Sequence, residues 1–333
     1  MSERRIRWGV LSTANIGLKR FIPGAAASRN GVVTAIASRD AARARDAATR
    51  LGIAHAYGSY EELLADPEID AIYNPLPNSL HAEWTLATAS AGKHVLCEKP
   101  LAIDAAQAQQ MIDGCRERGV LLMEAFMYRF HPQHARVRAL RDAGAIGELR
   151  AVRSAFTFQL EPFPPQNVRL RSELAGGALM DVGCYAVNAA RMLFGEEPQW
   201  ASAQWDHRAE FGVEVTLAGV LGFSDARMAA FDCGFRAWGQ GSYAAVGTRG
   251  QIDVPNAFVP NGETTIVVSD GSGRRTETVP AVDQYQLEAE EFADAILNDR
   301  PLRIPPDDAL GTLRAIEALR ASARAGGVRT EIR

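Results

Sequence analysis

The chain has 333 residues, with 36 basic and 40 acidic side chains that leave a net charge of −4 at pH 7. This length allows two domains with separate cores, and a content of 47% hydrophobic and 23% charged residues is typical of a soluble globular protein. The sequence has no run of basic residues, so nucleic acid is not expected as a partner. No stretch approaches the roughly 18 apolar residues of a membrane span.

The cysteines and the first residues bear on where the protein works. The four cysteines form neither C-x-x-C nor a zinc-finger spacing, so we expect reduced thiols. The start, MSERRIRWGVLS, has basic residues but no apolar signal-peptide core behind them. We therefore expect a cytoplasmic protein that has neither a membrane nor a nucleic-acid partner.

The first part of the chain, to about residue 125, alternates short apolar strands with helices. Strands are predicted at 6–12, 32–38, 69–77, 94–97 and 120–126, and helices at 15–28, 41–52, 60–67, 79–92 and 104–119. Continuous apolar strands separated by helices are typical of a parallel sheet that is buried on both faces. We predict a doubly wound α/β Rossmann domain over residues 1–125.

The second part has a different pattern. Residues 149–160 alternate between two faces, and 216–235 and 264–279 resemble hairpins around polar turns. Helices are predicted at 178–194, 284–298 and 307–325. This pattern indicates an α+β domain over residues 126–333 with a large open-faced, mostly antiparallel sheet, and its C-terminal helices are candidates to pack back on the first domain.

A possible phosphate-binding turn follows the first strand. A dinucleotide-binding protein has G-x-G-x-x-G here, which lets the backbone approach a pyrophosphate at the start of a helix. This chain has Ser12-x-Ala14-x-x-Gly17, with small residues in place of two glycines. An ordinary strand-to-helix turn is the alternative. The predicted cofactor contacts in this turn are Ser12, Thr13, Ala14, Asn15 and Ile16.

The end of the second strand bears on the choice of cofactor. An acidic residue here would bind the ribose hydroxyls of NAD, but the strand ends in Ala37-Ser38-Arg39. A hydroxyl and a guanidinium suit the 2′-phosphate of NADP, and Asp40 is expected to cap the next helix. We predict NADP, with Ser38, Arg39 and Arg43 as contacts; a solvated Ser-Arg pair is the alternative.

A lysine stands two residues after the predicted strand HVLC (94–97). The chain has 33 arginines and three lysines, and one of the lysines stands in Glu98-Lys99-Pro100. Lysine can be tuned by its surroundings and provides a compact charge, whereas arginine stays protonated. The carboxyl end of a parallel strand is where doubly wound sheets bind ligands. We therefore favour a functional Lys99 over a salt bridge to Glu98.

The segment GGALMDVGCYAVNAARML (176–193) begins a helix. Asp181, Tyr185 and Asn188 fall at i, i+4 and i+7, which predicts one polar stripe on an otherwise apolar helix. A hydride removed from an alcohol leaves a hydroxyl proton for a base, and a nearby cation such as Lys99 lets tyrosine act as that base. The alternative is a stripe that merely faces solvent.

These motifs together resemble the glucose–fructose oxidoreductase/inositol dehydrogenase (Gfo/Idh/MocA) family. Glu98-Lys99-Pro100, Asp181-Val182-Gly183-Cys184-Tyr185 and EAFMYRFHPQ (124–133) are similar to its branch of NADP-dependent aldose 1-dehydrogenases, aldose–aldose oxidoreductases and trans-dihydrodiol dehydrogenases. The resemblance implies that Lys99 and Tyr185 are catalytic and that Asp181 orients or binds the substrate. It also implies an oligomer, a homodimer or larger, that covers the open sheet face.

The resemblance implies further contacts by position. Residues that would contact cofactor are Pro75, Leu76, Asn78, His81, Glu98, Lys99, Arg129, Arg169 and Tyr285, and Lys99, Arg129, Asp181 and Tyr185 would contact substrate. His131 would lie near the cofactor or the sugar. His131 and His134 have H-x-x-H spacing without a third ligand cluster nearby, so no metal is predicted.

The resemblance implies an NADP-dependent sugar oxidoreductase of carbohydrate metabolism that converts C1 of an aldose to a lactone. One variant retains NADP(H) and reduces a second aldose to an alditol. Oxidation of a cyclic trans-diol is an alternative within the enzymes. A sugar- or nucleotide-sensing protein without catalysis is an alternative of another class, and loss of Lys99 or Tyr185 would favour it.

Overall fold

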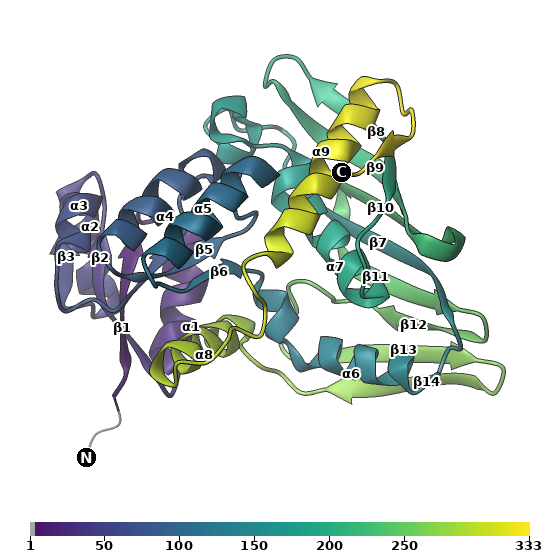
Figure 1. The fold of residues 1–333 in the computed structure, drawn as a ribbon, viewed down its shortest axis with the longest axis horizontal. Helices are drawn as coiled ribbons and strands as arrows, with labels where there is room; N and C mark the ends of the chain where they lie inside the picture. Colours follow the sequence, from purple (N-terminus) through teal and green to yellow (C-terminus); the bar gives the residue numbers. More distant parts are fainter. Residues whose placement is uncertain (1–3) are drawn as a thin grey trace. The chain divides into compact units, whose positions relative to one another are not determined.

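The computed structural model describes residues 4–333, and the chain forms two compact units (Figure 1). Unit 1 contains the described residues up to Phe130 and the segment Asp283–Ala309; unit 2 contains His131–Val282 and Leu310–Arg333. This division differs from the predicted boundary at residue 125. The chain stays in unit 1 through the 3-10 helix η3 (Met127–Phe130) because Phe130 belongs to the apolar core of that unit.

Unit 1 is built on a sheet whose six described strands are all parallel. The order is β3-β2-β1-β4-β5-β6, with β1 (Ile6–Leu11), β2 (Gly31–Ala37), β3 (His55–Tyr57), β4 (Ala71–Asn74), β5 (His94–Glu98) and β6 (Leu122–Ala125). The predicted doubly wound sheet is confirmed. The sequence missed β3, because three residues are too few to show a periodic pattern. The strand order reverses between β1 and β4, where such sheets bind ligands.

Four of the helices in the described part of unit 1 begin at a residue whose side chain caps them. They are η1 (Gly17–Phe21), α1 (Ile22–Ala27), α2 (Ala41–Leu51), α3 (Tyr60–Leu64), η2 (Asn78–Leu80), α4 (His81–Ser90), α5 (Ala105–Glu117) and α8 (Gln284–Leu297). Asp40, Ser59, Asp104 and Asp283 accept backbone N–H bonds at the starts of α2, α3, α5 and α8. The turn η1 is π-helical, and it leads into Pro23, which has no N–H for the usual helical bond.

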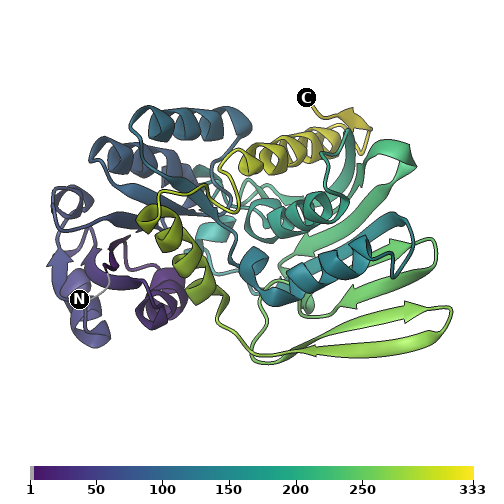
Figure 2. The ribbon, with the colours of Figure 1, turned by 60° about the horizontal axis from the view of Figure 1, so that its bottom comes forward.

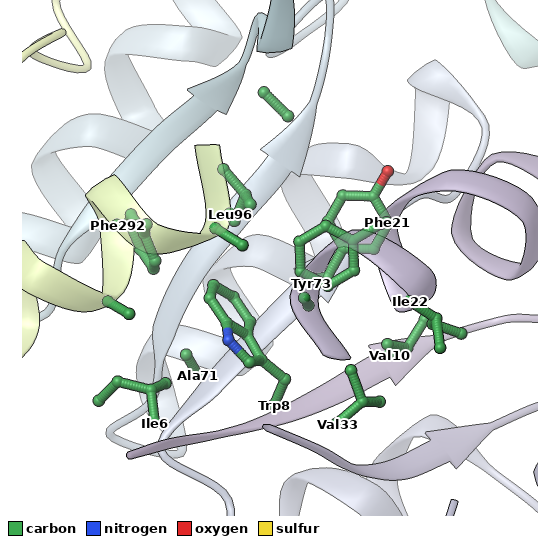
Figure 3. Close-up of a cluster of buried hydrophobic side chains, with 14 of the residues drawn as sticks. Ile6, Trp8, Val10, Phe21, Ile22, Val33, Ala71, Tyr73, Leu96 and Phe292 are labelled. Carbon is green, nitrogen blue, oxygen red and sulfur yellow. The ribbon is translucent and has the colours of Figure 1, made fainter. Parts of the chain in front are cut away.

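The core of unit 1 surrounds Trp8 on β1 (Figure 3). The Trp8 ring meets Phe21 edge-on at 5.2 Å and Phe292 of α8 at 5.6 Å, and Phe21 stacks on Tyr73 of β4 at 3.8 Å. All four side chains are buried. The late helix α8 therefore contributes to the core of the first unit, and burial of such aromatic rings stabilises it strongly.

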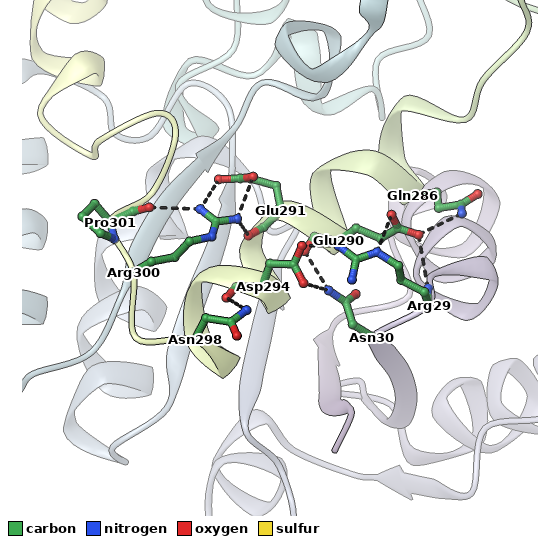
Figure 4. Close-up of polar contacts among 9 residues, drawn as sticks. All are labelled: Arg29, Asn30, Gln286, Glu290, Glu291, Asp294, Asn298, Arg300 and Pro301. Carbon is green, nitrogen blue, oxygen red and sulfur yellow. Dashed lines mark hydrogen bonds and ion pairs between the residues drawn. The ribbon is translucent and has the colours of Figure 1, made fainter. Parts of the chain in front are cut away.

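Polar contacts fix the returning segment to unit 1 (Figure 4). Asn30 donates to the Asp294 carboxylate at 2.7 Å and to the Glu290 carbonyl at 2.9 Å, and Arg29 also pairs with Asp294. Within the segment, Arg300 donates to both oxygens of Glu291 at 2.9 Å. The segment is thus an integral part of the first unit.

Unit 2 is built on a sheet that has nine strands within residues 4–333. The order is β14-β13-β12-β11-β7-β10-β9-β8-β15, with β7 (Leu149–Gln159), β8 (Trp200–Arg208), β9 (Val213–Gly222), β10 (Met228–Gly234), β11 (Arg236–Gly247), β12 (Gly250–Val254), β13 (Thr264–Asp270), β14 (Gly273–Val279) and β15 (Thr330–Glu331). Among these nine described strands, only β7 and β10 pair in parallel. Both predicted hairpins are confirmed, as β9–β10 and β13–β14.

The helices of unit 2 lie against one face of this sheet (Figure 2). They are α6 (Pro132–Asp142), η6 (Leu179–Gly183), α7 (Cys184–Phe194) and α9 (Asp308–Arg324), which joins unit 2 from Leu310. The short helices η4 (Val168–Leu170), η5 (Ser172–Leu174) and η7 (Ser224–Ala226) lie in connecting segments. The other face is hollowed, and small side chains such as Ala155, Ala218 and Ala230 line it beside Arg153 and Asp232.

Candidate functional site

The turn after β1 has a backbone shaped for a close approach. Ser12 has φ 67°, a left-handed conformation that usually favours glycine, and its hydroxyl accepts from the N–H of Ala14 at 3.2 Å. The Leu18 N–H donates to the Ala14 carbonyl at 3.0 Å, so the helix begins at once. Thr13, Ala14 and Ile16 are half-buried and Asn15 is exposed. The turn lies at the carboxyl end of β1, where the strand order reverses.

The end of β2 has a buried hydroxyl and an exposed cation. The Ser38 hydroxyl accepts from the Asp40 N–H at 3.2 Å, while the Asp40 carboxylate accepts from the N–H groups of Ala42 and Arg43. The expected capping role of Asp40 is therefore present. Arg39 is exposed, and its charge opposes the rise in the pKa of Tyr60 that burial causes. This strand end presents a guanidinium, and the acidic side chain is engaged by the helix.

The turns after β4 and β5 are joined by His81. Its Nδ1 lies 2.9 Å from the carbonyl oxygen of Pro100, and its Nε2 lies 2.8 Å from that of Leu76. The ring is fully buried, and burial lowers the pKa of His81. Both nitrogens are used inside the protein, so His81 fixes the two turns. Pro75 is buried against this region, and Asn78 opens η2 half-buried.

The turn after β5 presents Lys99. The Glu98 side chain beneath it is buried, and its carboxylate accepts from the Tyr73 hydroxyl at 2.6 Å and from the Lys99 N–H at 3.2 Å. The Lys99–Pro100 peptide bond is cis. Lys99 itself is half-buried. Glu98 therefore holds the turn in place by bonding to both Tyr73 and the Lys99 backbone. Tyr73 was not among the residues predicted from the sequence.

A second buried carboxyl belongs to the same region. Glu288 of α8 is fully buried, and within residues 4–333 neither of its carboxyl oxygens has a hydrogen-bond partner. Burial, with a smaller contribution from the charge of Glu98, raises the pKa of Glu288 well above its ordinary value. Tyr285, one turn earlier, is also buried, and burial raises its pKa. Glu288 was not predicted from the sequence; the signal that could have identified it is its place between the apolar residues Leu287 and Ala289.

Arg129 and His131 lie on either side of the boundary between the units. Arg129 in η3 donates to the Asp308 carboxylate at 2.7 Å, within unit 1. His131 is buried at the start of α6, where its Nδ1 accepts from the Gln133 N–H at 3.3 Å. His134 is bonded to the Tyr243 hydroxyl and the Ala257 carbonyl. The two histidine rings meet edge-on at 6.4 Å, but their hydrogen bonds go to different partners.

In unit 2, an arginine, a carboxylate and a phenol come together. The Nε of Arg169 donates to Asp181 at 2.6 Å, and the Arg169 guanidinium lies 5.6 Å above the Phe158 ring. Tyr185, one turn after Asp181 and 4% exposed, packs edge-on against Phe156 at 5.1 Å. Phe258 also meets the Tyr185 ring, at 5.4 Å. Asp181 and Tyr185, which are predicted to lie on one helix face, are accompanied by Arg169 and by the rings of Phe156 and Phe258.

Asn188 is the third member of the predicted stripe. Its side chain is buried and donates to the Thr312 hydroxyl of α9 at 3.2 Å. Tyr185 instead faces Phe156 of β7, so the two residues point toward different elements. The π-helical turn η6, which precedes α7, was not visible in the sequence, and Thr312 is distant along the chain. Asn188 therefore also connects α7 to α9.

The fold and these sites define a class of protein. A doubly wound parallel sheet has a tight turn at the point of strand reversal, which is where sheets of this kind bind dinucleotides. A second unit holds a tyrosine beside a paired arginine and carboxylate. This arrangement is that of a two-unit nicotinamide-nucleotide oxidoreductase.

Comparison with known proteins gives the family. Residues 6–126 match the oxidoreductase family with an NAD-binding Rossmann fold (GFO/IDH/MocA), and residues 134–253 match the GFO/IDH/MocA C-terminal domain. The chain is 41% identical over 321 residues to D-xylose 1-dehydrogenase (NADP(+)) 2 of Haloferax volcanii, covering 96% of this chain and 98% of that protein. The chain belongs to the GFO/IDH/MocA oxidoreductase family, as the resemblance implied.

Two solved structures are similar over nearly the whole chain. A 3-ketoreductase from Actinomadura kijaniata in complex with NADP and TDP-benzene is 34% identical with a TM-score of 0.91, covering 96% of this chain and 98% of that one. Aldose–aldose oxidoreductase from Caulobacter crescentus is 28% identical with a TM-score of 0.91, covering 98% and 100%. Within residues 4–333, no helix is both long and apolar enough to cross a membrane.

Proposed function

We propose that this protein is an NADP(H)-dependent sugar oxidoreductase that oxidises C1 of an aldose to an aldonolactone. The observation that carries the proposal is the cluster of Tyr185, Asp181 and Arg169, in a chain that also has Lys99 at the end of β5. Membership of the oxidoreductase family and the similarity to a xylose dehydrogenase support the same reaction class.

NADP is the proposed cofactor. Arg39 is exposed at the end of β2, and Asp40 is committed to the start of α2, so the strand end offers positive charge to a 2′-phosphate. The similar xylose dehydrogenase is named for NADP(+), and the similar 3-ketoreductase was solved with NADP. Residues Ser12 to Ile16 would hold the pyrophosphate at the turn after β1.

The proposed chemistry assigns one task to each residue. When bound, the nicotinamide ring supplies the hydride acceptor. The phenolate of Tyr185 accepts the proton of the sugar hydroxyl and becomes a neutral phenol. Lys99 provides a compact positive charge that polarises the reacting oxygen, and the Asp181 carboxylate accepts hydrogen bonds from neighbouring sugar hydroxyls.

The first test uses the purified protein with no nucleotide added. The protein is denatured, released nucleotide is identified, and a separate sample is mixed with an aldose while near-ultraviolet absorbance is recorded. Stoichiometric NADP that the aldose reduces and a second aldose reoxidises means an aldose–aldose oxidoreductase. Turnover only with added NADP means an ordinary dehydrogenase, and turnover with a cyclic trans-diol alone contradicts the sugar assignment. Absence of both nucleotide and turnover contradicts the proposal.

We also infer a homodimer that covers the free face of the unit 2 sheet. That face is hollowed and lined by small side chains, among them Ala155, Ala218 and Ala230, which allow another sheet to approach closely. Ala218→Arg places a long charged side chain in this surface and should convert the protein to monomers. Sedimentation velocity measures the change; a wild-type monomer contradicts the inference.

A further inference from the structure

The side chain of Arg169 is held by two contacts within unit 2, and its backbone by a third. Its Nε is bonded to Asp181 at 2.6 Å, and its guanidinium lies over the Phe158 ring. Its backbone N–H donates to the Asn167 side chain at 3.1 Å, which caps the short helix η4. A side chain with this many contacts holds its charge at one position, which a freely moving surface arginine does not.

Two glycines allow the Arg169 segment to reach the start of the helix that holds Tyr185. A Cβ at Gly176 would lie 2.5 Å from the Arg169 carbonyl oxygen, too close for any other residue. The Gly177 N–H donates to that same carbonyl at 2.8 Å, and the Asp181 N–H then donates to the Gly177 carbonyl at 3.0 Å. Gly177 has φ 108°, and a Cβ at this position would lie 2.5 Å from the Glu214 carboxylate. The motif therefore packs Arg169 directly against the turn that presents Asp181.

The charges in this cluster are coupled. The Asp181 carboxylate is the main cause that raises the pKa of Arg169; burial opposes the rise, and the charge of a Tyr185 phenolate adds to it. Such coupling is reciprocal, so the Arg169 charge favours the phenolate form of Tyr185. Asp181 limits this effect, because its negative charge offsets the guanidinium.

We propose that Arg169 is a positioning residue that acts through Tyr185: its guanidinium, fixed by Asp181 and the Gly176-Gly177 turn, stabilises the phenolate that accepts the substrate proton. This inference rests on the proposed function. It differs from the sequence-based expectation that Arg169 contacts the cofactor, and it gives unit 2 a cation for Tyr185 in addition to the expected Lys99.

Other titratable groups in unit 2 surround the cluster. Glu214 of β9 is buried and accepts from the Leu179 N–H at 2.9 Å, so its carboxylate is committed to the helix start. Cys233 of β10 lies beneath Gly183, and burial raises the pKa of that thiol, which stays neutral. The Cys184 thiol donates to the Asp181 carbonyl at 3.7 Å. Phe156, Phe158 and Phe258 carry no charge.

The test compares charge with shape. In Arg169→Gln the acidic limb of the kcat/KM profile for oxidation should move up by about one pH unit, the lower end of the range for a nearby charge, because 39% of the Arg169 side chain is exposed to water. Arg169→Lys keeps the charge and should keep the limb. Asp181→Asn should move the limb down, because the Arg169 charge is then no longer offset.

The control is Arg171, an arginine of the same segment that is exposed and paired with Glu173. Arg171→Gln should leave the limb unchanged. Equal loss of activity in Arg169→Gln and Arg169→Lys, without a shift of the limb, overturns the inference and indicates a purely structural arginine. A limb that moves in the same direction in Arg169→Gln and Asp181→Asn also overturns it.

A second measurement does not need turnover. Phenolate formation is followed by near-ultraviolet absorbance as pH rises, and the spectrum of Tyr185→Phe is subtracted to isolate Tyr185. The midpoint should rise in Arg169→Gln relative to the wild-type protein and stay unchanged in Arg171→Gln. If no aldose is oxidised, the proposed function fails while this titration still decides the role of Arg169.

Discussion

The strand end of unit 1 sets Glu98 against the hydroxyl of a buried tyrosine, whereas the helix start of unit 2 sets Asp181 against a partly exposed arginine. In unit 1, Glu288 is buried nearby with no hydrogen-bond partner among the described residues, and burial raises the pKa of its carboxyl well above the ordinary value. In unit 2, opposite charges are paired. The first arrangement holds a backbone turn, and the second sets the charge around a tyrosine.

The largest expected effect is on turnover, and it distinguishes Tyr185 of unit 2 from Tyr73 of unit 1. Tyr185→Phe should lower turnover about 10³-fold, the usual contribution of general acid–base catalysis, while nucleotide binding is retained. Tyr73→Phe removes a hydroxyl that donates to Glu98, so it should lower stability with less than about a tenfold effect on turnover. Kinetics and equilibrium denaturation measure both. Near-normal turnover in Tyr185→Phe contradicts the assignment of the base.

The next effect tests the backbone of the unit 2 turn. Gly176→Ala places a Cβ against the Arg169 carbonyl, so the Arg169 segment must move; we expect a loss of about 1–3 kcal/mol in the free energy of unfolding and a lower kcat. Gly271→Ala is the control, because its Cβ would meet nothing within 4 Å. Equal stability of the two variants would show that the close approach is not required.

The smallest effect concerns the buried carboxyl of unit 1. The pKa of Glu288 is raised above its ordinary value of 4.5, so between 4.5 and the folded-state pKa the folded protein binds more protons than the unfolded chain. Stability therefore falls as pH rises through this window. Glu288→Gln lacks this titration, and its Tm relative to wild type should rise by about 2–4 °C between about pH 5 and pH 8.

The control for this titration is Glu83, an exposed carboxylate of α4 in the same unit. Glu83→Gln should keep a constant Tm difference from wild type over the same pH range. A constant difference for Glu288→Gln as well would show that Glu288 is ionised in the folded protein. The statement that burial raises the pKa of a carboxyl in unit 1 would then be wrong.

The sequence by itself determined the sheet of unit 1, both hairpins of unit 2, and the positions of Lys99, Asp181 and Tyr185 on their elements. Apolar periodicity and helix caps are local signals, and the motifs are contiguous in the chain. The strand β3 was too short for such a signal. The return of 283–309 to the first unit depends on contacts such as Asn30 to Asp294, which lie far apart along the chain.

Only the tertiary structure decided which polar groups are partners. Tyr73 beneath Glu98, Arg169 beside Asp181, and Asn188 turned onto Thr312 all join different elements, and no spacing rule specifies such pairs. Burial also raises the pKa of Glu288, because the exclusion of water disfavours the charged form of a carboxyl. The chain specifies the reacting residues locally, and packing sets the electrostatic surroundings in which they act.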